Sequence, residues 1–224
     1  MAERVFDREL TQLKEKVAAL IDKVSQAMNK TAELLHRQDL SLAEAIISLE
    51  QESDRMESEL QQKASTLMAL HQPVARDLRF LLASMNLAHE LERIADQCLN
   101  ISQRLAEARP FLPLQWPPEI EEMVSRAEEM LRLATGAYLQ NSEELASQAI
   151  GQDLFLDDLK STVTSQYLDR INQQSIEPAR AVVYILLSRH LEKIGDLCRN
   201  IAEESYYLIR GEFIKHLKLT DLYH

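Results

Sequence analysis

The stretch Leu91-Glu92-Arg93-Ile94-Ala95-Asp96-Gln97-Cys98-Leu99-Asn100-Ile101 recurs one hundred residues later as Leu191-Glu192-Lys193-Ile194-Gly195-Asp196-Leu197-Cys198-Arg199-Asn200-Ile201. Seven of the eleven positions are identical. Self-similarity of this kind indicates that one structural unit is made twice along the chain. We therefore expect a pseudo-duplicated architecture, with these two segments at equivalent places.

Both copies carry polar residues at a spacing of four: Glu92, Asp96 and Asn100 in the first, and Glu192, Asp196 and Asn200 in the second. Successive helical residues turn by about 100°, so residues spaced by four lie on one face of a helix. The apolar residues Ile94, Cys98 and Ile101 fall about 180–240° away from this face. If they face the core, the carboxylates point outward or toward a neighbouring helix.

The composition is typical of an all-α protein. Among 224 residues there are only 4 glycines and 6 prolines, and aromatic residues make up 5%, so good helix formers dominate. The net charge of -11 argues against a nucleic-acid partner, which would require an excess of Lys and Arg on one face. It suits binding of cations or of basic protein surfaces.

The sequence predicts a cytoplasmic protein without membrane insertion. Residues 1–7 contain no apolar signal core, and the longest apolar runs, such as 181–187, are too short to cross a bilayer. Cys98 and Cys198 occupy equivalent repeat positions among helical apolar residues, which favours small packing residues over a disulfide.

Apolar spacing and end signals predict six long helices, over about 3–37, 41–71, 73–108, 119–140, 142–172 and 178–210, with a short C-terminal helix through Lys218. Ser41 and Glu44 have the spacing of a capping box. Pro73 and Pro178 suit the first turn of a helix, Ser142 suits a cap, and Gly211 suits a left-handed stop.

Four prolines within 110–118 exclude a helix there, because each removes an amide donor and restricts the preceding residue. This apolar segment should be a joint that packs against the protein. The predicted architecture is two antiparallel three-helix bundles, over residues 1–109 and 119–224, connected by the proline-rich segment. Helices of about thirty residues would be roughly 45 Å long and give an elongated shape.

Each unit carries a second acid pair on its middle helix: Glu50 and Asp54 in the first unit, Asp153 and Asp157 in the second. These pairs precede Glu92 and Glu192 by 42 and 39 residues, a separation that lets an antiparallel neighbour bring both pairs to one level. Four carboxylates at one level repel each other unless a cation lies between them. Oxygen ligands favour Mg, Ca, Mn or Fe ions, and Asn100 and Asn200 would be further ligands or orienting groups.

Other interpretations stay open. About six acid pairs at a spacing of four are expected by chance in this composition, so a solvated helix face and a metal-free scaffold are one alternative. A carboxylate-bridged di-metal oxidase or iron-storage bundle is another, for which Glu33 and His36 give half of a motif that has no second copy. His89 lies near the face of Glu92, but its counterpart is Arg189, which weakens a ligand role.

These segments resemble the PhoU family of phosphate-uptake regulators. The family pattern Leu-Glu-Arg-Ile-Gly-Asp followed by Asn-Ile-Ala is matched by residues 91–101, with Ala95 for glycine, and more fully by residues 191–202, with Lys193 for arginine. Residues 72–79 match the family's Gln-Pro-x-x-x-Asp-Leu-Arg, whereas the second half has only residues 177–180 there, so Asp77 and Arg79 have no counterpart. The resemblance covers essentially the whole chain.

The resemblance implies a non-enzymatic, cytoplasmic negative regulator of phosphate uptake and starvation signalling. Such a protein would be an adaptor between a phosphate ABC transporter ATPase and a sensor histidine kinase, and commonly a homodimer. It also implies binding of Fe, Zn or lighter ions such as Mn or Mg, in some members as multinuclear clusters. The metal candidates carried over are Glu50, Asp54, Glu92, Asp96, Asp153, Asp157, Glu192 and Asp196.

Overall fold

The computed structural model describes residues 5–212, which form six long helices and no strand. The helices are α1 (Val5–Arg37), α2 (Ala43–His71), α3 (Ala75–Glu107), α4 (Pro118–Gln140), α5 (Glu143–Asn172) and α6 (Pro178–Arg210), with short 3-10 helices η1 (Leu40–Leu42) and η2 (Arg109–Phe111). The all-α prediction and its six-helix segmentation are confirmed. The expected short helix through Lys218 lies outside the described residues.

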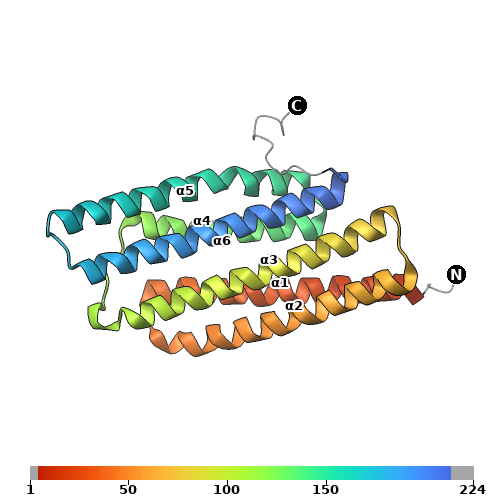
Figure 1. Cartoon of the computed structure of the whole chain (residues 1–224), viewed down its shortest axis with the longest axis horizontal. Helices are drawn as coiled ribbons and strands as arrows, with labels where there is room; N and C mark the ends of the chain where they lie inside the picture. The colour runs from red at the N-terminus through yellow and green to blue at the C-terminus, as the bar shows by residue number, and fades with distance from the viewer. Residues whose placement is uncertain (1–4, 213–224) are drawn as a thin grey trace.

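The chain folds into two antiparallel three-helix units that lie side by side along the long axis, giving an elongated molecule (Figure 1). The first unit is α1 to α3 and the second is α4 to α6, and the two meet mainly where α6 packs against α3. The repeated segments lie on these two helices, so the pseudo-duplication predicted from them is confirmed. Burial of their apolar faces provides the common core.

The two cysteines lie in this core, as expected for packing residues. Both are free and fully buried, and their thiols come close enough across the α3–α6 interface for one to influence the other. Burial raises the pKa of the Cys98 thiol to about 12. A thiol that stays protonated in an apolar interior is a poor nucleophile, so a packing role fits both residues.

Three predicted helix ends are confirmed. The Ser142 hydroxyl accepts a hydrogen bond from the Leu145 amide at 3.3 Å and caps α5. Pro178 lies in the first turn of α6, and Gly211, with φ of 78°, ends that helix in the left-handed conformation.

Two expectations for the first unit were wrong. The Ser41 side chain does not cap α2, because α2 begins only after η1 and its cap position, Leu42, makes no side-chain bond. Instead, the Asp39 carboxylate accepts a bond from the Ser41 amide at 3.0 Å and caps η1. Pro73 is also outside the first turn, since α3 starts at Ala75 after an extended residue.

The proline-rich segment packs onto both units, as its apolar composition predicted. The Gln38 side-chain amide donates to the Leu114 carbonyl and accepts from the Leu114 amide, both at 2.7 Å. The Trp116 indole donates to the Leu35 carbonyl at 2.8 Å, and the Tyr184 hydroxyl of α6 donates to the Gln115 carbonyl at 3.0 Å. These bonds fix the joint between the two units. Within residues 5–212, no helix combines the length and apolarity needed to cross a bilayer.

Candidate carboxylate sites

The structure brings together the four carboxylates predicted in the first unit. Burial raises the pKa of Glu50, and the charges of Asp54 and Asp96 raise it further. Burial, followed by the charge of Asp96, likewise raises the pKa of Glu92, which also feels Asp54. Because Asp96 of α3 acts on Glu50 of α2, and Asp54 of α2 acts on Glu92 of α3, the two acid pairs lie near one level, as the spacing of 42 residues suggested.

A fifth carboxylate, Glu57, joins this group, and the sequence analysis missed it. It lies one helical turn after Asp54, and its charge contributes to the raised pKa of Glu92. Its Oε1 accepts a bond from Gln61 at 3.2 Å and lies 3.9 Å from the imidazole Nδ1 of His89. We name Glu50, Asp54, Glu57, Glu92 and Asp96 the first carboxylate group.

Asn100 orients a member of this group. Its side-chain amide donates to Asp96 Oδ2 at 3.0 Å, and Gln97 donates to the same oxygen at 3.1 Å. These bonds hold the Asp96 carboxylate in one orientation. Asn200, its counterpart, makes no side-chain hydrogen bond to another described residue, so the two asparagines are not equivalent.

The first carboxylate group has no Lys or Arg partner among residues 5–212. Arg93, the basic residue of the repeated segment, pairs instead with Glu90 at 3.3 Å. The basic residues near the acid pair on α2 are also engaged elsewhere, Lys23 with Glu52 and Arg55 with Glu59. Five carboxylates therefore lie near one another without a Lys or Arg partner; the His89 ring lies 3.9 Å from Glu57, and His190 of α6 lies within the influence of the Asp96 charge.

The four predicted acids of the second unit also come together, but with cations among them. We name Asp153, Asp157, Glu192 and Asp196 the second carboxylate group. The Lys160 ammonium lies 3.1 Å from Glu192 Oε1 and 3.5 Å from Asp157 Oδ1, and so bridges α5 and α6. Burial raises the pKa of Glu192, and the ammonium partly opposes this rise.

Arg199 and Lys193 neutralise the rest of the second group. The Arg199 guanidinium pairs with Asp153, whose side chain is 8% exposed, and lies 4.0 Å from Asp196. Lys193 Nζ lies 2.9 Å from Asp196 Oδ2. Burial raises the pKa of Asp153, and Arg199 opposes that rise.

The repeat shows where this difference arises. Lys160 follows Asp157 by three residues, the place that Glu57 takes after Asp54. Arg199 follows Asp196 by three residues, where the first unit has Leu99. Both differences can be seen in the sequence. Only the folded structure shows that the Lys160 and Arg199 side chains point toward the acids of the second carboxylate group.

The donors of the first group suit a hard cation, because they are all carboxylate oxygens without a Lys or Arg partner, and four of the five side chains are partly buried while Asp54 is exposed. Within residues 5–212, however, no three His, Cys, Asp or Glu side chains converge closely enough to hold an ion as they stand. An ion bound there would require these side chains to turn inward. The second group does not fit an ion, since three cationic groups already occupy its oxygens.

Glu33, which with His36 gave half of the motif expected for a di-metal site, takes part in a cluster of ion pairs. Glu33 accepts from Lys30 at 2.9 Å and lies 2.7 Å from Arg37. Its carboxylate is thus paired outside the bundle core, whereas a di-iron site of that class needs inward-facing ligands.

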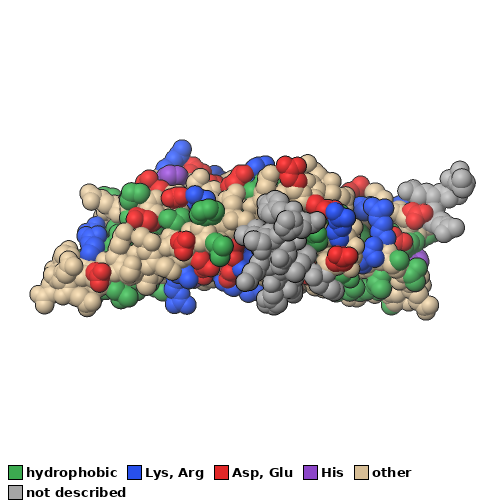
Figure 2. Space-filling model, turned by 90° about the horizontal axis from the view of Figure 1, so that it is seen from above, with side chains coloured by type: hydrophobic (Ala, Val, Ile, Leu, Met, Phe, Trp, Pro, Cys, Tyr) green, Lys and Arg blue, Asp and Glu red, His purple; other side chains and the backbone are tan. Residues whose placement is uncertain are grey.

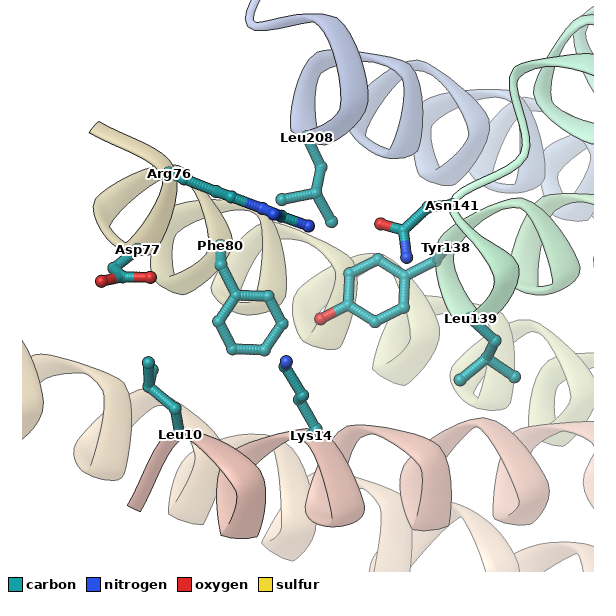
Figure 3. Close-up of a pocket in the computed structure, with 9 residues that line it drawn as sticks. All are labelled: Leu10, Lys14, Arg76, Asp77, Phe80, Tyr138, Leu139, Asn141 and Leu208. Atoms are coloured by element: carbon teal, nitrogen blue, oxygen red, sulfur yellow. The ribbon is translucent and has the colours of Figure 1, made fainter. Parts of the chain in front are cut away.

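A cleft of about 440 Å³ opens at one end of the molecule between α1, α3, α4 and α6 (Figure 3). Lys14 lies 5.3 Å from the centre of the Phe80 ring, and the Tyr138 hydroxyl shares a 2.7 Å hydrogen bond with Ser84. Figure 3 shows the Arg76 side chain extending from α3 toward Leu208 of α6. The charged side chains of the cleft are exposed, and its lining includes no nucleophile with an adjacent base.

Charged side chains of both signs are spread over the surface. On the face in Figure 2, acidic side chains lie among Lys and Arg side chains. Fold and site together define a class: helical proteins built from two repeated three-helix units, each with a carboxylate group between its middle and third helices.

Comparison with known proteins identifies the family. The family model of the PhoU domain matches twice, over residues 17–105 and 120–205, and the chain belongs to the PhoU family. The resemblance noted from the repeated segments is thereby confirmed.

Similar proteins span the whole chain. A phosphate-specific transport system accessory protein PhoU homolog of Aquifex aeolicus is 30% identical over 217 residues, covering 96% of this chain and 97% of its own. PhoU homolog 1 of Thermotoga maritima, with the same description, is 28% identical over 94% of this chain and 91% of its own. The crystal structure of PhoU from Pseudomonas aeruginosa superposes with a TM-score of 0.88 at 25% identity, covering 92% of this chain and 100% of that one.

Proposed function

We propose that this protein is a regulatory accessory protein of a phosphate-specific transport system. The observation that carries the proposal is the match of the PhoU domain to both units, together with accessory proteins of that system that align over nearly the whole chain. The described residues offer exposed helical surfaces and carboxylate groups, which suit binding better than catalysis.

In this proposal the protein acts in the cytoplasm as a non-enzymatic adaptor and forms a homodimer. It would connect the ATPase of the phosphate transporter with a sensor histidine kinase and hold phosphate-starvation signalling off when phosphate is plentiful. Direct recognition of phosphate at the first carboxylate group is disfavoured, because its unpaired negative charge repels an anion.

We further propose that the first carboxylate group binds metal ions, with Mn, Fe, Zn or Mg as candidates. The residues are Glu50, Asp54, Glu92 and Asp96, with Asn100 as the group that orients Asp96. A bound cation would offset the burial and the mutual repulsion that raise the pKa values of Glu50 and Glu92. It would also change the charge of a half-exposed surface where a partner protein could dock.

The regulatory role is tested by deleting the gene and measuring a phosphate-starvation reporter and phosphate uptake in phosphate-rich medium. We expect the reporter to be on in the deletion strain and off after complementation. Reporter and uptake levels equal to those of the parent strain would refute the role. Affinity purification from the complemented strain should recover the transporter ATPase and the kinase.

Metal binding is tested by elemental analysis of protein purified without chelator, and by the change in melting temperature on adding Mn²⁺ or Zn²⁺. If the protein is a metal-free scaffold, elemental analysis should find no bound metal and the added ions should leave the melting temperature unchanged. Anaerobic loading with Fe²⁺ followed by oxygen addition separates the third alternative, since a di-metal oxidase would consume oxygen with each cycle.

A further inference from the structure

We propose that the second unit supplies its own cations, with Lys160 and Arg199 in the place of metal ions, so that this chain takes external cations only at the first carboxylate group. The inference rests on the proposed metal binding for the first unit. Its claim about the second unit stands separately, on the ion pairs of that unit.

Lys160 occupies the position that a bridging ion would need. Its ammonium contacts oxygens from two helices, Asp157 on α5 and Glu192 on α6, at 3.5 and 3.1 Å. A divalent ion bound by these oxygens would have to displace the ammonium and then remain close to its charge. Both steps oppose binding, because like charges repel strongly where solvent screening is reduced.

Arg199 likewise occupies the carboxylate of Asp153, the most buried acid of the second carboxylate group. Its guanidinium pairs with Asp153 and lies 4.0 Å from Asp196 and 3.8 Å from Glu203. A guanidinium stays charged at all ordinary pH values, so Asp153 has a permanent counterion. Within the described residues, the first carboxylate group, with Glu57 and Leu99 at the corresponding positions, has no such partners.

The consequence is a molecule with two similar units that respond differently to the same solution. A rise in free divalent cation would change the charge between α2 and α3 and leave that between α5 and α6 as it is. A partner that contacts both units would then sense the difference between them.

Exchange of the distinguishing residues between the units tests the inference. Lys160→Glu with Arg199→Leu gives the second unit the residues of the first, and Glu57→Lys with Leu99→Arg does the reverse. Each full-length variant is equilibrated with Mn²⁺, and bound metal per chain is measured by elemental analysis. Circular dichroism confirms the helical fold.

We expect wild-type protein to bind Mn²⁺ at the first group only, so that the reverse exchange removes all binding. The forward exchange should about double the Mn²⁺ bound at saturation. Binding that persists in the reverse exchange, or no gain in the forward exchange, overturns the inference. If the double variant does not fold, Lys160→Glu alone leaves the Arg199–Asp153 pair intact and should still increase Mn²⁺ binding.

Failure of the proposed function gives a different result. If wild-type protein binds no Mn²⁺ but the forward exchange does, metal binding by the first group is refuted while the role of Lys160 and Arg199 is supported. If neither binds, both proposals are refuted.

Discussion

Removing the Arg199 guanidinium should destabilise the protein by leaving a buried carboxylate without its counterion. Asp153 is 8% exposed, and Arg199, at 36% exposed, is its cationic partner. Breaking a buried ion pair at one partner costs about 3–5 kcal/mol. Because Arg199 is partly exposed, we expect Arg199→Leu to fall near the lower value, about 3 kcal/mol.

The loss is measured by urea denaturation and by thermal unfolding in chelator-containing buffer at pH 7. For a chain of this size, 1 kcal/mol corresponds to about 2–4 °C, so the melting temperature should fall by roughly 6–12 °C. Arg93→Leu is the matched control, because it removes the same group from the equivalent helix. Its partner Glu90, with a side chain 15% exposed, lies one turn away on the same helix at 3.3 Å, and the expected cost of losing such a helical pair is at most about 1 kcal/mol.

A double-mutant cycle with Asp153→Asn identifies the cause. If the uncompensated carboxylate is responsible, Asp153→Asn should recover stability in the Arg199→Leu background, with a coupling of at least about 1.5 kcal/mol. Additive effects of the two substitutions would refute the reasoning, as would an Arg199→Leu variant within about 0.5 kcal/mol of wild type.

The pH dependence gives an independent check. Burial raises the pKa of Asp153, and removal of Arg199 takes away the charge that opposes this rise. When the pKa of a carboxyl group is raised in the folded state, the free energy of unfolding of the protein falls as the pH rises through that pKa. The deficit of Arg199→Leu should therefore be greatest near neutral pH and shrink as the pH falls toward the ordinary carboxyl range.

Three further predictions concern other parts of the chain. Ser142→Ala should cost about 1 kcal/mol in urea denaturation, because it removes the cap of α5, whereas Ser41→Ala, which caps no long helix, should cost a few tenths. Gly195→Ala should lower the free energy of unfolding by about 1 kcal/mol, because the added Cβ would overlap the buried side chain of Leu156. Overpacking of this kind costs about 1–3 kcal/mol, which exceeds the gain of about 1 kcal/mol in helix propensity. An unchanged or higher melting temperature would contradict this prediction. Burial and neighbouring acids raise the pKa of Glu50, so metal-free protein should gain stability as the pH falls from 7 toward the carboxyl range, and Glu50→Gln should flatten that gain in pH-dependent melting curves.

The fold could be predicted largely from the sequence because its determinants are local or repeated. The apolar spacing of the helices, the prolines of residues 110–118 and the left-handed stop at Gly211 each act within a few residues. The two predictions that failed, the cap at Ser41 and the first-turn position of Pro73, concern the exact residue at which a helix begins. Such boundaries depend on neighbouring turns, here η1 and the extended Val74.

The candidate sites, like the fold, could be predicted from the sequence only in part. The repeated spacing of four identified eight of the acids, because a helical face is a property of the sequence itself. Glu57 was missed because its membership of the first group depends on how α2 lies against α3. The sequence also could not reveal that α3 and α6 pack against each other with the two cysteines near their contact.

The sequence by itself therefore determined two similar three-helix units and the helical faces on which their acids lie. Only the tertiary structure decided that one acid group is left without Lys or Arg partners while the other is neutralised by Lys160, Lys193 and Arg199. The physical reason is distance: the Coulomb energy between two charged groups depends on their separation in space, and the packing of α5 against α6 sets that separation.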